Sequence, residues 1–273
     1  MERNVNKEPR GRLTKDGIRW YEPADFAGMH AAGALAAHIL DAMSDHVFPG
    51  QTTGKIDEII TQMVEEAGAT SATIGYKGYK HASCISVNHV VCHGIPSDKT
   101  LKDGDILNID VTVIVDGWFG DTSRMYVAGR LPRKAERLIE VTHEALMRGI
   151  EVVKPGNTFG DIGHAIQSFV EGHRMSVVRD FCGHGLGRVF HAPPNVLHYG
   201  KPSAGAMLEP GMIFTIEPMV NLGRPETKTL ADDWTAVTRD KSLSAQFEHS
   251  VGVTETGVEI FTLSRNGKFH PTY

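Results

Sequence analysis

The sequence predicts an α+β protein made of two similar halves. One pair of matching segments is LKDGDILNIDVTV at 101–113 and LEPGMIFTIEPMV at 208–220. A second pair, PGQTTGKIDEIITQMVE from Pro49 and PGNTFGDIGHAIQSFVE from Pro155, occurs in the same order at nearly the same offset. The period is too long for a solenoid, so we expect two halves related by a pseudo-twofold axis around one core. Helical periodicity and β-branched runs alternate by block, which is typical of the α+β class.

Four helices are predicted from apolar residues that recur at spacings of three to four positions. The first covers about 26–47, and Pro23 stands in its opening turn, where proline is tolerated. A second helix covers 56–64 after a Pro-Gly turn, and its repeat in the other half covers 162–170. A further helix is expected across 133–150.

Strands are predicted where β-branched residues form runs between these helices. The runs cover 84–92, 105–115, 118–127, 212–221 and 246–254. The Asp116-Gly117 pair between two of these runs is a strong hairpin signal and predicts a two-residue turn.

No linker rich in proline, glycine or serine divides the chain into independent domains. We therefore expect a single domain over 14–273, with the internal repeat at approximately 14–140 and 141–273. Residues 1–13 are expected to form a mobile arm.

The composition excludes several classes of protein. The chain has 273 residues, a net charge of −5 and 41% hydrophobic residues, which argues against a disordered chain and against a nucleic-acid binder held by basic charge. No apolar run approaches the length of a membrane span, and the charged N-terminus lacks the apolar stretch of a secretory signal. The three cysteines, Cys84, Cys92 and Cys182, form no C-x-x-C pair and fit reduced thiols. We therefore expect a cytoplasmic protein with no membrane or nucleic-acid partner.

Two aspartates are predicted to lie on one face of the hairpin. If its turn has two residues, Asp110 lies opposite Ser123 and Asp121 lies opposite Thr112, which makes the aspartates diagonal neighbours about 7–8 Å apart. Two carboxylates this close repel each other, and a divalent cation between them would remove the repulsion. Either aspartate alone could instead face solvent or cap a loop.

The repeat adds further acidic residues to this pair. Glu217 occupies the position equivalent to Asp110, so matching carboxylates suggest a site on the pseudo-twofold axis. Glu248, in the run SAQFEHSVGV, has apolar neighbours, although a lone glutamate on a strand usually faces solvent.

Three histidines are candidates for the same site. His184 lies between glycines in CGHGLGR, His191 follows seven residues later, and His93 stands in VVCHGIP. Each alone is more often a buried, hydrogen-bonded ring than a ligand or proton donor. Dinucleotide-binding, Walker, H-E-x-x-H and G-x-S-x-G motifs are absent, which leaves metal-assisted hydrolysis as the favoured chemistry.

The strings NIDVTV, GDTS, GHGLGR, TIEPM and FEHS closely resemble those of the type I methionine aminopeptidases, over nearly the whole chain from about Thr14. The resemblance implies the pita-bread fold, in which two pseudo-symmetric halves with antiparallel sheet surround a dinuclear metal site. It implies five ligands: Asp110, Asp121, His184, Glu217 and Glu248. In the family pattern Asp121 and Glu248 bridge the metals, Asp110 binds one, and His184 and Glu217 bind the other.

The resemblance also implies the reaction. Such enzymes remove the initiator methionine from nascent proteins when the second residue is small, with a metal-bridged water as the nucleophile. Glu217 would shuttle the proton, His93 would contact the scissile peptide nitrogen, and His191 would steady the tetrahedral oxyanion. The expected cofactors are two divalent ions, Fe²⁺, Co²⁺ or Mn²⁺. The expected partners are peptides with a free N-terminal methionine, as on nascent chains at the ribosome, and the protein is expected to be a monomer.

Two further sites follow from the resemblance. The methionine pocket corresponds to Tyr76, Tyr79, Cys84, Phe190 and Trp234. Thr73 stands where bacterial relatives often carry a cysteine, which bears on thiol-directed inhibitors more than on catalysis. A site for Na⁺ or K⁺ corresponds to Asn88, Val90 and Ser244.

Two other functions are open to the same fold. A proline-directed aminopeptidase or dipeptidase would be expected to carry a large additional N-terminal domain, whereas only a short arm precedes the first helix here. A non-catalytic peptide-binding module would be expected to have lost ligands, whereas all five positions hold residues able to bind metal.

Overall fold

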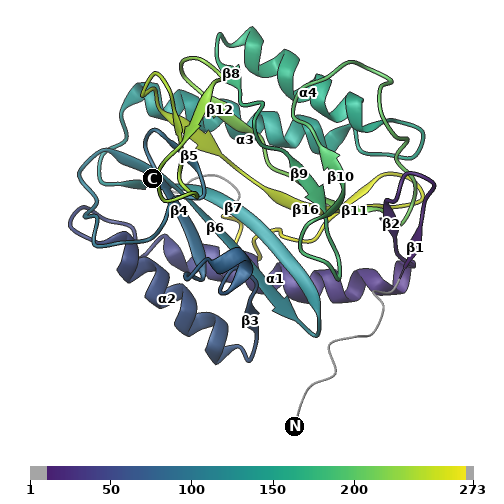
Figure 1. Cartoon of the computed structure of the whole chain (residues 1–273), viewed down its shortest axis with the longest axis horizontal. Helices are drawn as coiled ribbons and strands as arrows, with labels where there is room; N and C mark the ends of the chain where they lie inside the picture. The colour runs from purple at the N-terminus through teal and green to yellow at the C-terminus, as the bar shows by residue number, and fades with distance from the viewer. Residues whose placement is uncertain (1–10, 269–273) are drawn as a thin grey trace.

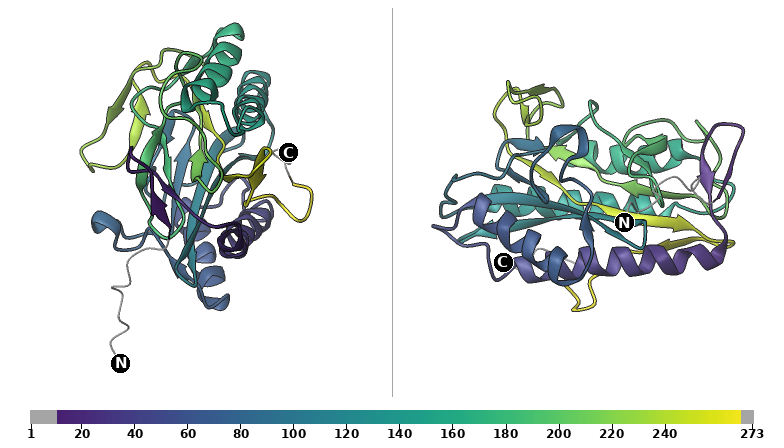
Figure 2. Two further views of the ribbon diagram at one scale, coloured as in Figure 1. Left: turned by 90° about the vertical axis from the view of Figure 1, so that its right-hand side faces the viewer. Right: turned by 60° about the horizontal axis from the view of Figure 1, so that its bottom comes forward.

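The computed structural model describes residues 11–268 and has the predicted α+β architecture. Antiparallel sheets form the middle of the molecule, and four helices lie along their outer side (Figure 1; Figure 2). These helices are α1 (Phe26–Met43) and α2 (Thr53–Glu66) in the first half, and α3 (Arg133–Glu151) and α4 (Phe159–Gly172) in the second. All four predicted helices are confirmed. Helix α1 ends before residue 47 because the Ser44 hydroxyl and the next two N–H groups bond to carbonyls three residues back, which tightens the turn.

The halves repeat their local structure as well as their sequence. Helices α2 and α4 are each 14 residues long and begin after equivalent threonines, Thr52 and Thr158. The Thr52 hydroxyl accepts a hydrogen bond from the Lys55 N–H, and Thr158 shares a capping box with Asp161. The motif P-G-x-T therefore encodes the same helix start twice.

The predicted hairpin is confirmed residue by residue. Strands β6 (Asp105–Val115) and β7 (Trp118–Ala128) pair around the Asp116-Gly117 turn, in which both residues have positive φ. The register places Asp110 opposite Ser123 and Thr112 opposite Asp121. The two aspartates therefore lie on one face, as expected.

Three predicted strands are each divided in two. The observed strands are β4 (Ser83–Val87) and β5 (Val90–Cys92), β11 (Ile213–Ile216) and β12 (Met219–Asn221), and β15 (Ser244–Gln246) and β16 (His249–Val253). The prediction of a single strand is wrong in two of these runs for local reasons: Asn88 has a left-handed φ of 59°, and Pro218 has no N–H for the ladder. It is wrong in the third because β15 and β16 pair with strands of different sheets. Because β11 pairs with β16 while β12 pairs with β15 in another sheet, Glu217 and Glu248 lie where the chain changes sheet.

Shorter strands complete the sheets. They are β1 (Arg12–Leu13), β2 (Arg19–Trp20), β3 (Thr70–Ser71), β8 (Ser176–Val177), β9 (Gly183–Gly185), β10 (Ala192–Val196), β13 (Thr227–Thr229), β14 (Ala236–Thr238) and β17 (Val258–Ile260). The sheet orders are β10-β9-β11-β16-β17, β15-β12-β8, β13-β14-β5 and β3-β6-β4 with β7 on β6. Strand β1, at the end of the expected arm, pairs with β2, and residues 1–10 lie outside the described residues.

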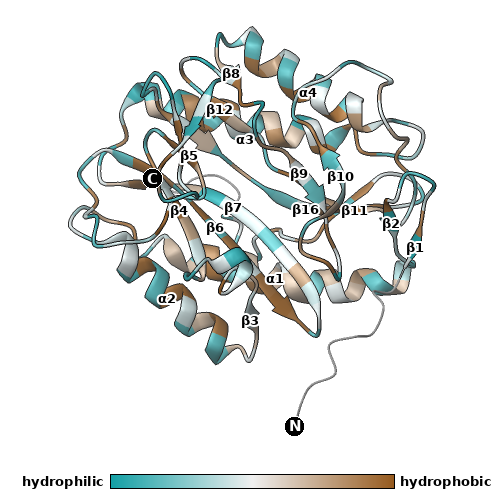
Figure 3. Cartoon of the chain, in the orientation of Figure 1, coloured by the Kyte–Doolittle hydropathy of each residue, from teal (hydrophilic) through white to brown (hydrophobic). Residues whose placement is uncertain are grey.

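Two large apolar clusters form most of the core, one of them mainly in the second half and the other in the first. Leu138 of α3 and Phe214 of β11 belong to one cluster, and Ile60 of α2 and Ile109 of β6 belong to the other. Hydrophilic and hydrophobic residues alternate along α2 (Figure 3), and the apolar ones that are buried are Ile56, Ile60 and Val64. Within residues 11–268, no helix combines the length and the apolar character that a membrane crossing requires.

Candidate active site

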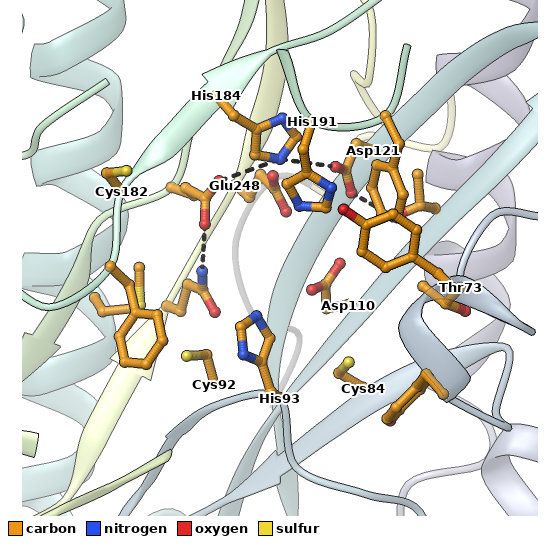
Figure 4. A pocket seen from close by; sticks show the side chains of 18 of the residues that line it. Thr73, Cys84, Cys92, His93, Asp110, Asp121, Cys182, His184, His191 and Glu248 are labelled. Atoms are coloured by element: carbon orange, nitrogen blue, oxygen red, sulfur yellow. Dashed lines mark hydrogen bonds and ion pairs between the residues drawn. The ribbon is translucent and has the colours of Figure 1, made fainter. Parts of the chain in front are cut away.

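A cavity of about 640 Å³ opens where the sheets of the two halves meet (Figure 4). The structure brings to its wall all five expected metal ligands, both expected catalytic histidines and every expected pocket residue. These are Asp110, Asp121, His184, Glu217, Glu248, His93, His191, Tyr76, Tyr79, Cys84, Phe190 and Trp234, and Thr73 lines it as well.

The hairpin supplies two carboxylates with different surroundings. The Thr112 hydroxyl donates a hydrogen bond of 2.7 Å to Asp121 Oδ1, which leaves Oδ2 for the cavity. Asp110 Oδ1 is buried and has no hydrogen-bond partner among the described residues. A buried carboxylate oxygen without a donor is costly, and a bound cation would satisfy it.

The two glutamates are held at the sheet junction. The Thr215 hydroxyl donates to Glu217 Oε1 at 2.8 Å, and the Gln246 amide lies 3.3 Å from Oε2. The Glu248 N–H donates to the Ser123 carbonyl at 3.1 Å, which ties this glutamate to β7 of the other half. Neither glutamate lies within a strand, because β11 ends before Glu217 and β15 ends before Glu248. Both side chains project into the cavity from the point where the chain passes from one sheet to another.

His184 is held by close packing of three strands. A Cβ on either flanking glycine would overlap a carbonyl oxygen, that of Thr215 for Gly183 and that of Pro193 for Gly185. The ring Nδ1 lies 3.1 Å from the Gly185 carbonyl and therefore donates to it. Nε2 then faces the acids, 3.5 Å from Asp121 Oδ2 and 3.8 Å from Glu217 Oε1.

The electrostatics of this cluster favour a cation. Burial and the neighbouring carboxylates raise the pKa of Asp110 and of Glu248, and burial raises the pKa of Glu217 to about 7. Ligand atoms of Asp121, His184 and Glu248 lie within 4.8 Å of one another. Four carboxylates and one imidazole are a donor set suited to divalent ions such as Fe²⁺, Mn²⁺ and Co²⁺. The residues present therefore fit divalent metal.

Aromatic rings form the rest of the wall. The Tyr79 and Trp234 ring centroids are 4.8 Å apart, and the Tyr76 and Phe190 centroids are 4.9 Å apart. Cys84 lies opposite Asp110 in the β4–β6 register, so its thiol stands beside the acids. The cavity thus has an apolar cup, formed by Tyr76, Tyr79, Cys84, Phe190 and Trp234, next to its charged end.

The two other histidines, His93 and His191, also line the cavity (Figure 4). His93 follows β5 with a left-handed φ of 56°, and burial lowers its pKa. Burial lowers the pKa of His191 to about 4, and its ring centroid lies 4.2 Å from that of His184. Both rings are therefore neutral at pH 7 and can each donate one N–H.

The expected monovalent-cation residues lie outside the cavity wall. The Asn88 carbonyl accepts a hydrogen bond from the Ser244 N–H at 2.9 Å. The Asn88 side chain is engaged with the Ile106 N–H and with Asp105, and Val90 begins β5 two residues later.

Several residues that hold the ligands were not predicted. Thr112 lies opposite Asp121 in the hairpin register, so the register that places the aspartates was a usable signal for it. Thr215 stands near the end of β11, two positions before Glu217. Gln246 and His198 gave no such signal. The buried His198 Nε2 accepts the Glu217 N–H at 3.0 Å, from 19 residues away in the sequence.

The sequence comparisons agree with this geometry. Residues 27–255 match metallopeptidase family M24. The chain is 54% identical over 257 residues to the methionine aminopeptidase of Rickettsia prowazekii, which covers 94% of this chain and 99% of that protein. It is 52% identical over 246 residues to that of Escherichia coli K12, which covers 89% of this chain and 93% of that protein.

Solved structures of enzymes with different names share this fold. A crystal structure of the Rickettsia prowazekii methionine aminopeptidase superposes with a TM-score of 0.89 at 55% identity, over 90% of this chain and 100% of that one. The prolidase of Pyrococcus horikoshii shares the fold, with a TM-score of 0.72, but is only 19% identical and is matched over 64% of its length. The five acid and histidine positions, the M24 match and these relatives lead to one conclusion: the chain belongs to the methionine aminopeptidases of metallopeptidase family M24.

Proposed function

We propose that this chain is a metal-dependent aminopeptidase that removes the N-terminal methionine from proteins whose second residue is small. One observation carries the proposal: four carboxylates and one imidazole from both halves meet in a single cavity beside an aromatic cup. The relatives named methionine aminopeptidase support the same reaction.

The five ligands would hold two divalent ions, with Asp121 and Glu248 shared, Asp110 on one side, and His184 and Glu217 on the other. Fe²⁺, Co²⁺ and Mn²⁺ all suit these donors. Such ions, when bound, supply Lewis acidity to the scissile carbonyl and lower the pKa of water.

The chain's own groups account for proton transfer and charge stabilisation. Glu217 would carry the proton between the nucleophile and the leaving amine, because it is the carboxylate that the structure holds by two side-chain hydrogen bonds at the sheet junction. Thr215 and Gln246 fix its two oxygens and so its direction. The neutral rings of His93 and His191 would donate to the substrate, His93 near the peptide nitrogen and His191 near the developing oxyanion.

The cup accounts for the choice of methionine. Aromatic faces and a polarizable thiol favour a thioether side chain. The cup residues are Tyr76, Tyr79, Cys84, Phe190 and Trp234. Thr73, which also lines the cavity, has a hydroxyl, which does not react with electrophiles as a cysteine thiol at that position would. We therefore expect this protein to resist thiol-directed inhibitors that act at that position.

Further assignments complete the proposal. Residues 14–273 act as one catalytic domain, and the protein works as a cytoplasmic monomer on nascent chains at the ribosome. Asn88, Val90 and Ser244 bind Na⁺ or K⁺, supported by the contact between the Asn88 carbonyl and the Ser244 N–H.

The proposal is tested by release of free methionine from a Met-Ala-Ser peptide and from matched peptides in which a bulky residue follows methionine. We expect rapid release from the first and little from the others. Equal cleavage of all these peptides would contradict the preference for a small second residue. A further peptide that carries proline in second position tests the proline-directed alternative, which only the fold supports, and its preferential cleavage would favour that alternative.

N-terminal acetylation of the same Met-Ala-Ser peptide is expected to lower methionine release by at least about 100-fold. The acetyl group removes the free amine that the acidic end of the cavity would recognise, and it adds bulk there. The measurement is the initial rate on both peptides at equal concentration. Efficient cleavage of the acetylated peptide would show that the amine is not recognised.

A further inference from the structure

A buried carboxylate outside the cavity wall is connected to the cup by hydrogen bonds. Asp57 lies on α2, and its side chain faces the segment that joins the loop after β3 to β4. Its Oδ1 accepts from the Ser83 N–H at 2.9 Å and from the Ser83 hydroxyl at 2.7 Å. Its Oδ2 lies 2.9 Å from His81 Nδ1. One side chain therefore fixes both the first residue of β4 and the residue two before it.

The carbonyls of these same two residues hold cavity groups. The Ser83 carbonyl accepts the Tyr79 hydroxyl at 2.9 Å, and the His81 carbonyl accepts the Thr73 hydroxyl at 2.7 Å. Tyr79 in turn packs against Trp234 across the cup. Movement of residues 81–83 would therefore move two groups on the cavity wall.

The repeat indicates that the fold alone does not require this carboxylate. Gly163 of α4 occupies the position equivalent to Asp57, and a Cβ there would meet the carbonyl oxygens of Tyr199 and Leu197. Helix α4 thus packs directly on backbone where α2 uses an aspartate. The aspartate belongs to the half that carries Tyr76, Tyr79 and Cys84 of the cup.

We propose that Asp57 is a positioning residue for the methionine pocket, which holds residues 81–83 and through them the hydroxyls of Tyr79 and Thr73. The proposal rests on the assignment of the cup to the methionine side chain. Its consequence is selectivity: a fixed Tyr79 ring discriminates an unbranched thioether from a branched side chain, and a mobile one does so less well.

The test compares Asp57→Asn with Glu58→Gln. Asparagine keeps an oxygen for Ser83 but presents an amide to His81. Glu58 is exposed on the same helix and pairs with Lys55, so its change removes one carboxylate without touching the pocket. For Met-Ala-Ser we expect Asp57→Asn to raise KM about tenfold with kcat within about twofold. We expect the ratio of kcat/KM for methionine over leucine as first residue to fall at least fivefold, and Glu58→Gln to match the unmodified chain.

A second variant keeps the proposal testable if Asp57→Asn does not fold. His81→Ala removes the partner of Oδ2, at a side chain that is 31% exposed, and with it the edge contact between the His81 and Tyr79 rings, whose centroids are 5.7 Å apart. It should therefore shift KM and selectivity in the same direction. Unchanged selectivity in both variants, with thermal stability either kept or lowered, would overturn the positioning role.

Calorimetric binding of free methionine and of leucine to the metal-loaded protein separates the two proposals. If the unmodified chain releases no methionine from peptides, the proposed function fails. The positioning role is then judged by binding alone: it holds if Asp57→Asn weakens methionine binding relative to leucine, and it fails if the ratio is unchanged.

Discussion

Replacement of Glu217 by glutamine is expected to lower methionine release from Met-Ala-Ser by about 10²–10⁴-fold while the fold is kept. Glutamine has nearly the same shape, and its carbonyl oxygen can still accept from Thr215. It cannot carry a proton between the nucleophile and the leaving amine, and a neutral amide is a poorer ligand for divalent ions than a carboxylate. The measurement is kcat/KM with saturating divalent metal, together with far-UV circular dichroism.

The matched control is Glu226→Gln, an exposed glutamate in the loop after β12. It should retain the turnover of the unmodified chain. The metal content of purified Glu217→Gln shows which of two causes lowers its activity. If both ions remain and activity is lost, proton transfer is the cause; if an ion is lost, ligation contributes. Turnover near that of the unmodified chain would remove Glu217 from the mechanism.

Much of the site could be predicted because a tight turn fixes the register of a hairpin. Once Asp116-Gly117 is taken as a two-residue turn, the facing of Asp110 and Asp121 follows from the period of two along each strand, and the structure has that register throughout. The repeat extended the argument to Glu217, since equivalent sequence gave equivalent structure in both halves.

The strand interruptions could not be predicted from the hydrophobic pattern. Buried residues stand on both sides of Glu217, and buried Phe247 and Val251 stand on the two sides of Glu248, so each run resembles one continuous strand. Pro218 was a local sign of a break, but the break at Glu248 depends on which strand pairs with which. That pairing is set by the whole sheet. For the same reason, the His198 ring that accepts the Glu217 N–H could be found only in three dimensions.

Removal of divalent ions is expected to abolish methionine release and to lower the thermal stability of the unmodified chain at pH 7.5. A ligand that binds only the folded state stabilises it in proportion to the logarithm of its concentration, so chelation removes that contribution. It also leaves the acids of the cavity facing one another. Fe²⁺, Co²⁺ or Mn²⁺ added back one at a time should restore both activity and melting temperature, and activity that survives thorough chelation would contradict metal chemistry.

Asp110→Asn is expected to separate the effect of metal on activity from its effect on thermal stability. The variant should be inactive and should gain less stability from metal, yet without metal it should be more stable than the unmodified chain at pH 7.5. Burial, together with the carboxylates of Asp121 and Glu217, raises the pKa of Asp110, so its charged form destabilises the folded state. This penalty is absent below about pH 4, where the group is protonated in both states, and grows as pH rises toward the folded pKa.

The stability difference between the two metal-free proteins should therefore widen from pH 5 to pH 7.5. A relief of about 1 kcal/mol would raise the melting temperature by roughly 2–4 °C for a chain of this size. Asp98→Asn, an exposed aspartate outside the cavity, provides the control and should show no such widening. If metal-free Asp110→Asn were less stable than the unmodified chain at every pH, Asp110 would contribute to the fold itself. In that case the clustered acids would not destabilise the metal-free fold, and bound metal would have no such destabilisation to offset.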